Sequence, residues 1–176
     1  MMPRTLCAHR KMKMKFPHKN DVSHDIGRIE TIIDSGVFES KNSTHPLRES
    51  AFVELMICLR DLMSKTEMYG QRIDFNDDIS HDKDTKDITD TITHVRDSIC
   101  HIDSFKRILG KTKLRVSFNS INGEGTLMKV GDIVLRSDYQ DDVCFFYGNH
   151  KIYLKRHIIR ALKEAKRQLK PIMNGT

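Results

Sequence analysis

The stretch KDITDTITHVRDSICHIDSFKRIL, residues 86–109, predicts one long amphipathic helix. Its apolar residues recur every three or four positions and are Ile88, Ile92, Val95, Ile99, Ile102 and Phe105. This spacing is the helical period of a stripe that packs against a protein core. At about 100° per residue, the opposite side of the helix collects Thr93, Arg96, Asp97, Cys100, His101 and Ser104. Because a solvated face would more simply carry Lys and Glu, this set indicates a catalytic site or a binding surface.

Three other stretches of the chain have helical periodicity. Residues 21–37 carry isoleucines at helical spacing and reach Gly36, which favours the end of a helix. Residues 48–68 are apolar at nearly every position of their first half, as in a central and mostly buried helix. The exposed side of that helix is expected to hold Glu54, Arg60 and Asp61. Residues 153–170 form an amphipathic helix near the C-terminal end.

Residues 113–154 have the pattern of strands. Leu114, Val116 and Phe118 alternate with polar residues, and Asn-Gly at 122–123 is typical of a hairpin turn. Short apolar runs follow at 126–130, 132–136, 143–147 and 151–154. These runs predict a small antiparallel meander of three to five strands. The expected fold is therefore mainly α: an up-and-down four-helix bundle with a small antiparallel β insertion, at about residues 113–154, before the last helix.

The positive charge of the chain is concentrated at its N-terminal end. The chain of 176 residues has a net charge of +6, and residues 1–20 hold six basic side chains and no acid. The other 156 residues carry 24 basic and 24 acidic side chains. We therefore expect a basic, flexible tail over residues 1–20 and one balanced domain over residues 21–176. This balance, and the lack of a helix-turn-helix pattern, argue against a DNA-binding regulator.

The cysteines and the hydropathy pattern bear on the compartment. Cys7, Cys58, Cys100 and Cys144 lie far apart and form no CxxC pair, so a structural zinc site or a disulfide framework is not expected. No apolar run approaches the roughly 18 residues of a membrane span, and no secretory signal is visible. We therefore expect a cytoplasmic protein that has no metal or cofactor site and no membrane partner.

The sequence RDSICH, residues 96–101, places an arginine and a histidine within reach of one phosphate group. On a helix, Arg96 and His101 lie about 7.5 Å apart along the axis and about 140° apart around it. An imidazole can accept the proton of a ribose 2′-hydroxyl or protonate the leaving 5′-oxygen near neutral pH. A guanidinium can hold the phosphate and stabilise the charge of the transition state. Since one histidine cannot be acid and base together, two chains meeting at a dyad would complete the site.

This element resembles the HEPN (higher eukaryote and prokaryote nucleotide-binding) superfamily. Its ribonucleases are helical bundles whose third helix carries Arg-x4-6-His, with Asn, Asp or His commonly after the arginine, and Arg96, Asp97 and His101 match that pattern. The resemblance implies a homodimer that cleaves RNA without metal. His101 would be the general acid or base, Arg96 the phosphate ligand, and Asp97 the residue that orients Arg96 or the partner's His101. Many such enzymes are toxins or antiphage effectors, and some have an antitoxin partner.

Two other interpretations of these residues stay open. Arg4 and His9 have the same spacing in a segment without a plausible site, so the spacing alone has little specificity. Arg96 and His101 are also compatible with a solvated surface that pairs with acids such as Asp97 or Asp103. The chain would then be a noncatalytic helical module that binds nucleotide, RNA or a protein partner.

Basic residues on the last predicted helix are candidates for RNA contacts. Lys155, Arg156 and Arg160 lie on one side of it and suit an RNA backbone, or equally an acidic partner. His157 is expected on the solvated surface of the same helix. Cys100 and His101 diverge by about 100° and cannot form a Cys–His pair directly. The leading hypothesis is therefore an endoribonuclease that cleaves single-stranded or loop RNA through Arg96, Asp97 and His101.

Overall fold

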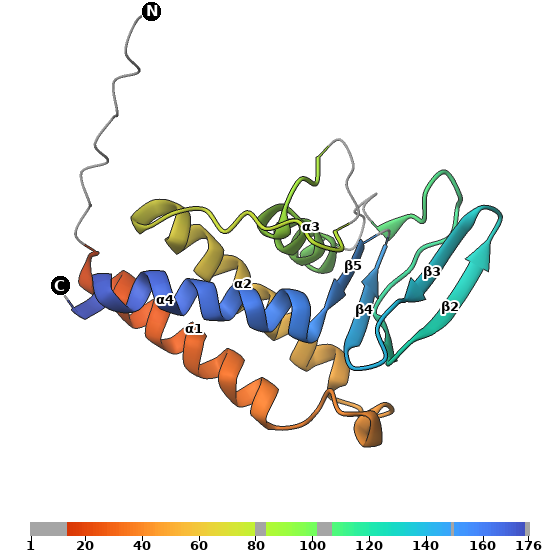
Figure 1. The fold of residues 1–176 in the computed structure, drawn as a ribbon, viewed down its shortest axis with the longest axis horizontal. Helices are drawn as coiled ribbons and strands as arrows, with labels where there is room; N and C mark the ends of the chain where they lie inside the picture. Colours follow the sequence, from red (N-terminus) through yellow and green to blue (C-terminus); the bar gives the residue numbers. More distant parts are fainter. Residues whose placement is uncertain (1–13, 80–83, 102–106, 149, 175–176) are drawn as a thin grey trace, which may run out of the picture.

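The computed structural model describes residues 14–79, 84–101, 107–148 and 150–174 (Figure 1). The longer helices are α1 (Phe16–Asp34), α2 (Arg48–Tyr69), α3 (Ile88–Cys100) and α4 (Arg160–Asn174). A 3-10 turn, η1 (Ser40–Asn42), lies between α1 and α2, and a π-helical segment, η3 (Leu154–Ile159), leads into α4. The strands are β1 (Asn119–Asn122), β2 (Gly125–Val130), β3 (Ile133–Ser137), β4 (Val143–Tyr147) and β5 (His150–Tyr153).

The strands form two antiparallel sheets that lie between α3 and η3 in the sequence. One sheet has three strands in the order β1-β4-β5, and the other is the β2-β3 hairpin. Figure 1 shows the helices on one side of β4 and β5 and the hairpin on the other side. The three-stranded sheet is therefore the middle layer of the molecule.

Strand β4, VCFFY, is buried on both faces, and this places it in the middle layer. Val143, Phe145 and Tyr147 pack in the core made by the helices. Cys144 and Phe146, which point the other way along a strand, pack in a second core with residues of the hairpin. Because both faces carry apolar side chains, β4 requires cover on each side.

The expected fold, an up-and-down four-helix bundle with a small β insertion at about residues 113–154, is wrong. The described residues form four α-helices and five strands in two antiparallel sheets, and the helices are not consecutive, because the strands lie before the last helix. The physical reason is the burial of β4, which joins the helical core to the hairpin core. The strands are thus a layer of the fold, and the molecule is an α+β protein.

The Asn122-Gly123 pair does not close a hairpin, contrary to the prediction. Strand β1 pairs with β4, and β2 pairs with β3, so the two strands flanking this pair belong to different sheets. Gly123 has φ 87°, and its N–H donates to the carbonyl of Asp142 at 2.9 Å. The hairpin turns lie instead at Gly131 and Gly148, where φ is 56° and 60°.

Helix α4, predicted over residues 153–170, begins at Arg160 after the π-helical segment and extends to Asn174. The other helices begin and end close to their predicted limits, with two exceptions. Helix α1 begins at Phe16, so residues 16–20 of the expected tail belong to a helix whose first turn contains Pro17. Residues 1–13 lie outside the described residues. Helix α2 ends before Gly70 as expected. The second exception is α3, whose end shapes the candidate site.

Candidate functional site

Helix α3 carries the Arg-x4-His element and has an acidic cap at its N-terminal end. The side chain of Asp87 accepts a hydrogen bond from the backbone N–H of Asp90 at 2.9 Å. The guanidinium of Arg72 donates to both carboxylate oxygens of Asp87, at 2.8 and 2.9 Å, and to Asp90 at 2.6 Å. The hydrogen bonds to Asp87 raise the pKa of Arg72 above its usual value. The start of α3 is therefore fixed to the segment that follows α2.

Arg96 and Asp97 lie on the half-exposed face of α3. The residues of the buried face are Ile88, Thr89, Thr91, Ile92, Val95 and Ser98. The Arg96 guanidinium donates one hydrogen bond to the Asp97 carboxylate, at 3.1 Å. The side chains of Arg96 and Asp97 are 39% and 32% exposed. Since a guanidinium has five N–H donors, Arg96 keeps donors for a ligand while Asp97 orients it.

Helix α3 ends at Cys100, and the prediction of one helix over residues 86–109 is wrong. His101 has φ −114° and ψ 98°, which is extended backbone, although its N–H still donates to the carbonyl of Asp97 at 3.0 Å. Its side chain is exposed. Arg96 therefore lies on the helix as predicted. His101 follows the helix, so helix geometry does not fix its position relative to Arg96. The predicted helical positions Ile102, Ser104 and Phe105 lie outside the described residues.

Arg107 caps the last turn of α3. Its guanidinium donates to the carbonyls of Ser98, at 2.8 Å, and Ile99, at 3.1 Å. These carbonyls belong to the last turn of α3 and have no helical N–H to accept from. Ile108 then forms an antiparallel bridge with Arg115, so the chain enters the strand layer directly after Arg107.

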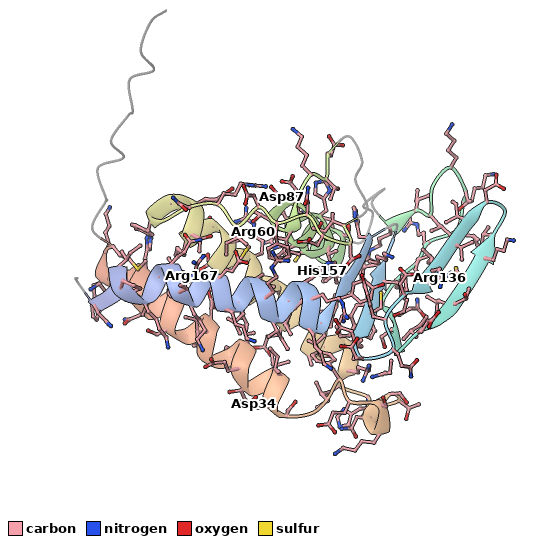
Figure 2. All side chains as sticks on the ribbon, viewed as in Figure 1. Asp34, Arg60, Asp87, Arg136, His157 and Arg167 are labelled. Atoms are coloured by element: carbon pink, nitrogen blue, oxygen red, sulfur yellow. The ribbon has the colours of Figure 1, made fainter. Side chains whose placement is uncertain are left out.

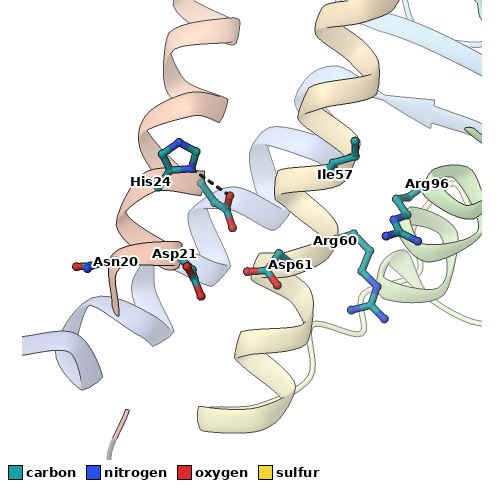
Figure 3. A pocket seen from close by; sticks show the side chains of 8 residues that line it. Asn20, Asp21, His24, Ile57, Arg60, Asp61 and Arg96 are labelled. Carbon is teal, nitrogen blue, oxygen red and sulfur yellow. Dashed lines mark ion pairs between the residues drawn. The ribbon is translucent and has the colours of Figure 1, made fainter. Parts of the chain in front are cut away.

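A groove of about 790 Å³ lies beside Arg96, along the surface of α1, α2 and α3 (Figure 3). Its lining residues are Asn20, Asp21, His24, Asp25, Ile57, Arg60, Asp61 and Arg96. Helix α2 runs along the middle, with α1 on one side and α3 on the other. Asp21 and Asp61 lie between α1 and α2, whereas Arg60 and Arg96 extend between α2 and α3. The groove therefore has an acidic half and a basic half.

Asp25 and Asp61 form a carboxyl pair in the acidic half. Burial of Asp25, its hydrogen bond with Asp61 and the negative charge there raise the pKa of Asp25 to about 6. Asp61 also accepts a hydrogen bond from Lys65 at 3.2 Å. The thiol of Cys58 is buried beside the pair, and burial with the charge of Asp25 raises the pKa of Cys58 to about 11. Cys58 is therefore a protonated thiol at neutral pH and no nucleophile.

We expect Asp25→Asn to stabilise the protein at alkaline pH and to leave it nearly unchanged near pH 4. The unfolded chain ionises Asp25 near its ordinary pKa of 3.8, whereas the folded chain ionises it near 6. The folded state therefore binds the proton more tightly, and this contribution to stability is lost as the pH rises from about 4 through about 6. The asparagine keeps a donor for Asp61 without the charge. The expected gain in unfolding free energy at pH 8 is about 1–2 kcal/mol, measured by urea denaturation.

Asp21→Asn is the matched control for this prediction. It removes the same charge from the same half of the groove, but its side chain is 54% exposed, and its nearest cation, the ammonium of Lys65, lies 3.8 Å away. The control is expected to change the unfolding free energy by less than about 0.5 kcal/mol at either pH. A gain for Asp25→Asn that is equal at pH 4 and pH 8 would refute the raised pKa as its cause.

Lys155 and Arg156, two of the predicted RNA-binding residues, are anchored to the loop before β4. The Lys155 ammonium donates to the carbonyl of Asp141. Arg156 pairs with Asp141 at 3.0 Å and with Asp142 at 3.1 Å, and its guanidinium stacks 3.7 Å from the ring centre of Tyr139. Asp142 is buried and also accepts the backbone N–H groups of both basic residues, at 2.8 and 3.1 Å. These contacts fix the start of the last helical segment.

Arg160, the third predicted RNA-binding residue, also has acidic partners within the chain. It pairs with Asp77 at 2.7 Å and with Glu164 at 3.2 Å, and it stacks 3.8 Å from the ring centre of Phe75. RNA binding by these basic residues stays a prediction. An RNA phosphate would have to compete with carboxylates that are already in place.

His157 is buried, and its predicted place on a solvated surface is wrong. Its Nδ1 accepts a hydrogen bond from the backbone N–H of Tyr153 at 3.1 Å, and its Nε2 lies 2.9 Å from the carbonyl oxygen of Asp77 (Figure 2). This pattern requires Nε2 to carry the proton and the ring to be neutral. Burial lowers the pKa of His157, which favours the same form. His157 therefore joins β5 to the loop after α2 and is not available for a ligand.

The sequence analysis did not single out the α1 and α2 residues of the groove. Arg60 and Asp61 were expected on the exposed side of their helix, and both line the groove. Asp25 and His24 carried no signal, because they form no short motif and their role depends on how α1 packs against α2. Only the packing brings Arg60 next to Arg96.

Three further observations bear on what the site can bind. Among residues 14–79, 84–101, 107–148 and 150–174, no three His, Cys, Asp or Glu side chains lie close enough together to hold a metal ion. No helix in those ranges is both long enough and apolar enough to span a bilayer. Comparison of the chain with protein-family models, with curated proteins and with solved structures finds no match.

Proposed function

We propose that this protein is a metal-independent endoribonuclease that acts as a homodimer on single-stranded or loop RNA. One observation carries the proposal: α3 places Arg96 at the basic half of an open groove, and the side chain of His101 is exposed. Arg96 is the phosphate ligand and Asp97, 3.1 Å from it, the positioning residue. His101 is the general acid or base. The resemblance to HEPN ribonucleases in the Arg-x4-His element supports these roles.

The proposed reaction is a transesterification within the RNA. The imidazole of one His101 accepts the proton of the 2′-hydroxyl, and the 2′-oxygen attacks the adjacent phosphorus. The bond from phosphorus to the 5′-oxygen breaks, and the protonated imidazole of the partner's His101 supplies a proton to that oxygen. The products are a 2′,3′-cyclic phosphate and a 5′-hydroxyl. Arg96 donates hydrogen bonds to the non-bridging oxygens, where charge increases in the transition state.

A second copy of the chain supplies the second imidazole in this proposal. His24 is the histidine that lines the groove, but it belongs to α1, and α2 lies between it and Arg96 (Figure 3). His157 is buried and neutral. A dyad beside α3 would instead bring two exposed His101 side chains to one phosphate.

Mixing wild-type subunits with His101→Ala subunits tests the shared site. If each site needs both histidines, activity follows the square of the wild-type fraction, so that an equal mixture after subunit exchange has about a quarter of the full activity. Independent sites would leave about half. The matched control is His45→Ala, an exposed histidine in the loop between α1 and α2, and mixtures with it are expected to keep full activity. Loss in simple proportion to the fraction of His101→Ala would contradict the shared site.

A noncatalytic module that binds nucleotide, RNA or a protein is the second candidate. The observation that favours it is the end of α3 at Cys100, because helix geometry then does not hold His101 toward Arg96. We further propose that the ribonuclease is a toxin or antiphage effector with an antitoxin partner. Only the resemblance to HEPN ribonucleases supports this step. A cytoplasmic location belongs to the same proposal.

A further inference from the structure

Arg60 differs from most arginines of the described chain because no carboxylate pairs with it there. Arg28 pairs with Glu54, and Arg72, Arg136, Arg156 and Arg160 each have at least one acidic partner. For Arg60, the described ranges contain neither an ion pair nor a hydrogen bond of the guanidinium. The residue is half-buried in the groove. Its guanidinium donors are therefore available to an anionic ligand that enters the groove.

The positively charged side chains of Arg60 and Arg96 are neighbours in the groove. Both side chains extend into the space between α2 and α3 (Figure 3). Asp61, on the acidic side, accepts from Lys65 at 3.2 Å, and Asp97, which does not line the groove, pairs with Arg96 at 3.1 Å. The basic half of the groove thus presents two guanidinium groups to solvent. Guanidinium groups bind phosphate oxygens through paired hydrogen bonds.

Ile57 gives the groove an apolar surface between the two charged halves. Its side chain is 45% exposed, although it is large and hydrophobic, and it lines the groove with Arg60 and Arg96. A volume of about 790 Å³ is within the range of small-molecule sites. An apolar patch beside two cations suits a nucleotide unit, whose sugar and base are less polar than its phosphate.

We propose that Arg60 and Arg96 together bind the phosphate backbone of single-stranded RNA, with Ile57 packing against the nucleotide. Arg60 is a binding residue for a phosphate next to the one that is cleaved. The inference rests on the proposed function for the identity of the ligand, and it adds a contact outside the Arg-x4-His element. It does not depend on cleavage.

Binding of a 2′-O-methyl RNA oligonucleotide, followed by fluorescence anisotropy at several salt concentrations, tests this inference. The methylated probe has no free 2′-hydroxyl and cannot be cleaved by the proposed reaction. Arg60→Gln is expected to weaken binding about tenfold and to reduce the slope of log affinity against log salt by about 0.7, the value for one phosphate contact on a single strand. Its midpoint of urea unfolding is expected to stay unchanged, since the side chain has no partner in the described chain.

Arg167→Gln is the matched control. Arg167 is an exposed arginine on α4 and does not line the groove, whereas Arg60 lies on α2 and does. The control is expected to bind the probe as the wild type does. Wild-type affinity for Arg60→Gln, an equal loss for Arg167→Gln, or no binding by the wild type would overturn the inference. If the wild type binds RNA through Arg60 but never cleaves it, the proposed nuclease activity is contradicted and the proposed binding site is retained.

Discussion

Replacement of His101 by alanine is expected to lower the rate of RNA cleavage by about 10²–10⁴-fold. The reason is the loss of both proton-transfer groups of a symmetric site at once, since each chain contributes the same residue. The side chain is exposed and follows the last turn of α3, so its removal creates no cavity. The rate of cleavage of a labelled RNA, measured with excess enzyme, checks the prediction.

Two controls separate this effect from loss of folding or of binding. The His101→Ala protein is expected to unfold at the wild-type urea concentration and to bind the methylated RNA probe with wild-type affinity. His45→Ala, which removes another exposed histidine, is expected to cleave at the wild-type rate. Equal loss in both variants would show that histidine removal in general, and not His101 chemistry, lowers the rate.

Replacement of Arg48 by methionine is expected to cost about 3–5 kcal/mol of unfolding free energy. Arg48 is 3% exposed, and burial lowers its pKa, yet the groups that it donates to are uncharged. Its guanidinium donates to the Val37 carbonyl and to the Asn122 side chain, both at 2.9 Å, and to Ser120 at 3.1 Å. Methionine fills the space of the stem but leaves the buried carbonyl of Val37 and the partly buried side chains of Ser120 and Asn122 without this donor. Urea denaturation at neutral pH measures the loss.

The contacts of Arg48 join the loop after α1 to strand β1, so the effect should be local as well as global. Hydrogen exchange of the backbone in residues 36–47 is expected to accelerate in Arg48→Met. Arg167→Met, an exposed arginine changed in the same way, is expected to stay within about 0.5 kcal/mol of the wild type. A loss below about 1 kcal/mol for Arg48→Met would contradict the structural role given to Arg48.

Helical periodicity alone predicted most of the helices. Helix α2 was expected over residues 48–68 and extends from Arg48 to Tyr69, because its apolar residues and Gly70 are local signals. The end of α3 was not predictable in this way. The apolar period continues past Cys100 in the sequence, but the guanidinium of Arg107 satisfies the carbonyls of the last turn. This capping contact comes from a residue beyond the helix, and the apolar period does not reveal it.

The prediction of a small β insertion in place of a central sheet failed for a different reason. The run at 143–147 was predicted as a strand, but it was placed in a small insertion before the last helix. Its unbroken apolar composition, with Phe145 facing the helices and Phe146 facing the hairpin, was the available signal for a doubly covered strand. An interpretation of this run as a strand covered on both faces would have predicted a central sheet.

Some residues of the candidate site were predictable from their own helix, whereas others depend on how the helices pack together. Arg96 and Asp97 were predicted from the helix that carries them, and their half-exposed places agree with that face. Arg60 and Asp25 depend on the packing of α2 against α3 and α1, which no short motif encodes. The buried place of His157 depends on the Asp77 carbonyl, 80 residues earlier in the chain.

The central claim is that Arg96 and His101 cleave RNA without metal. Its most direct test is incubation of the purified protein with end-labelled single-stranded RNA in EDTA, followed by identification of the new ends. The proposal predicts fragments with 2′,3′-cyclic phosphate and 5′-hydroxyl ends from the wild type and none from His101→Ala. Intact RNA with the wild type, or equal cutting by both proteins, would contradict it and favour the noncatalytic module.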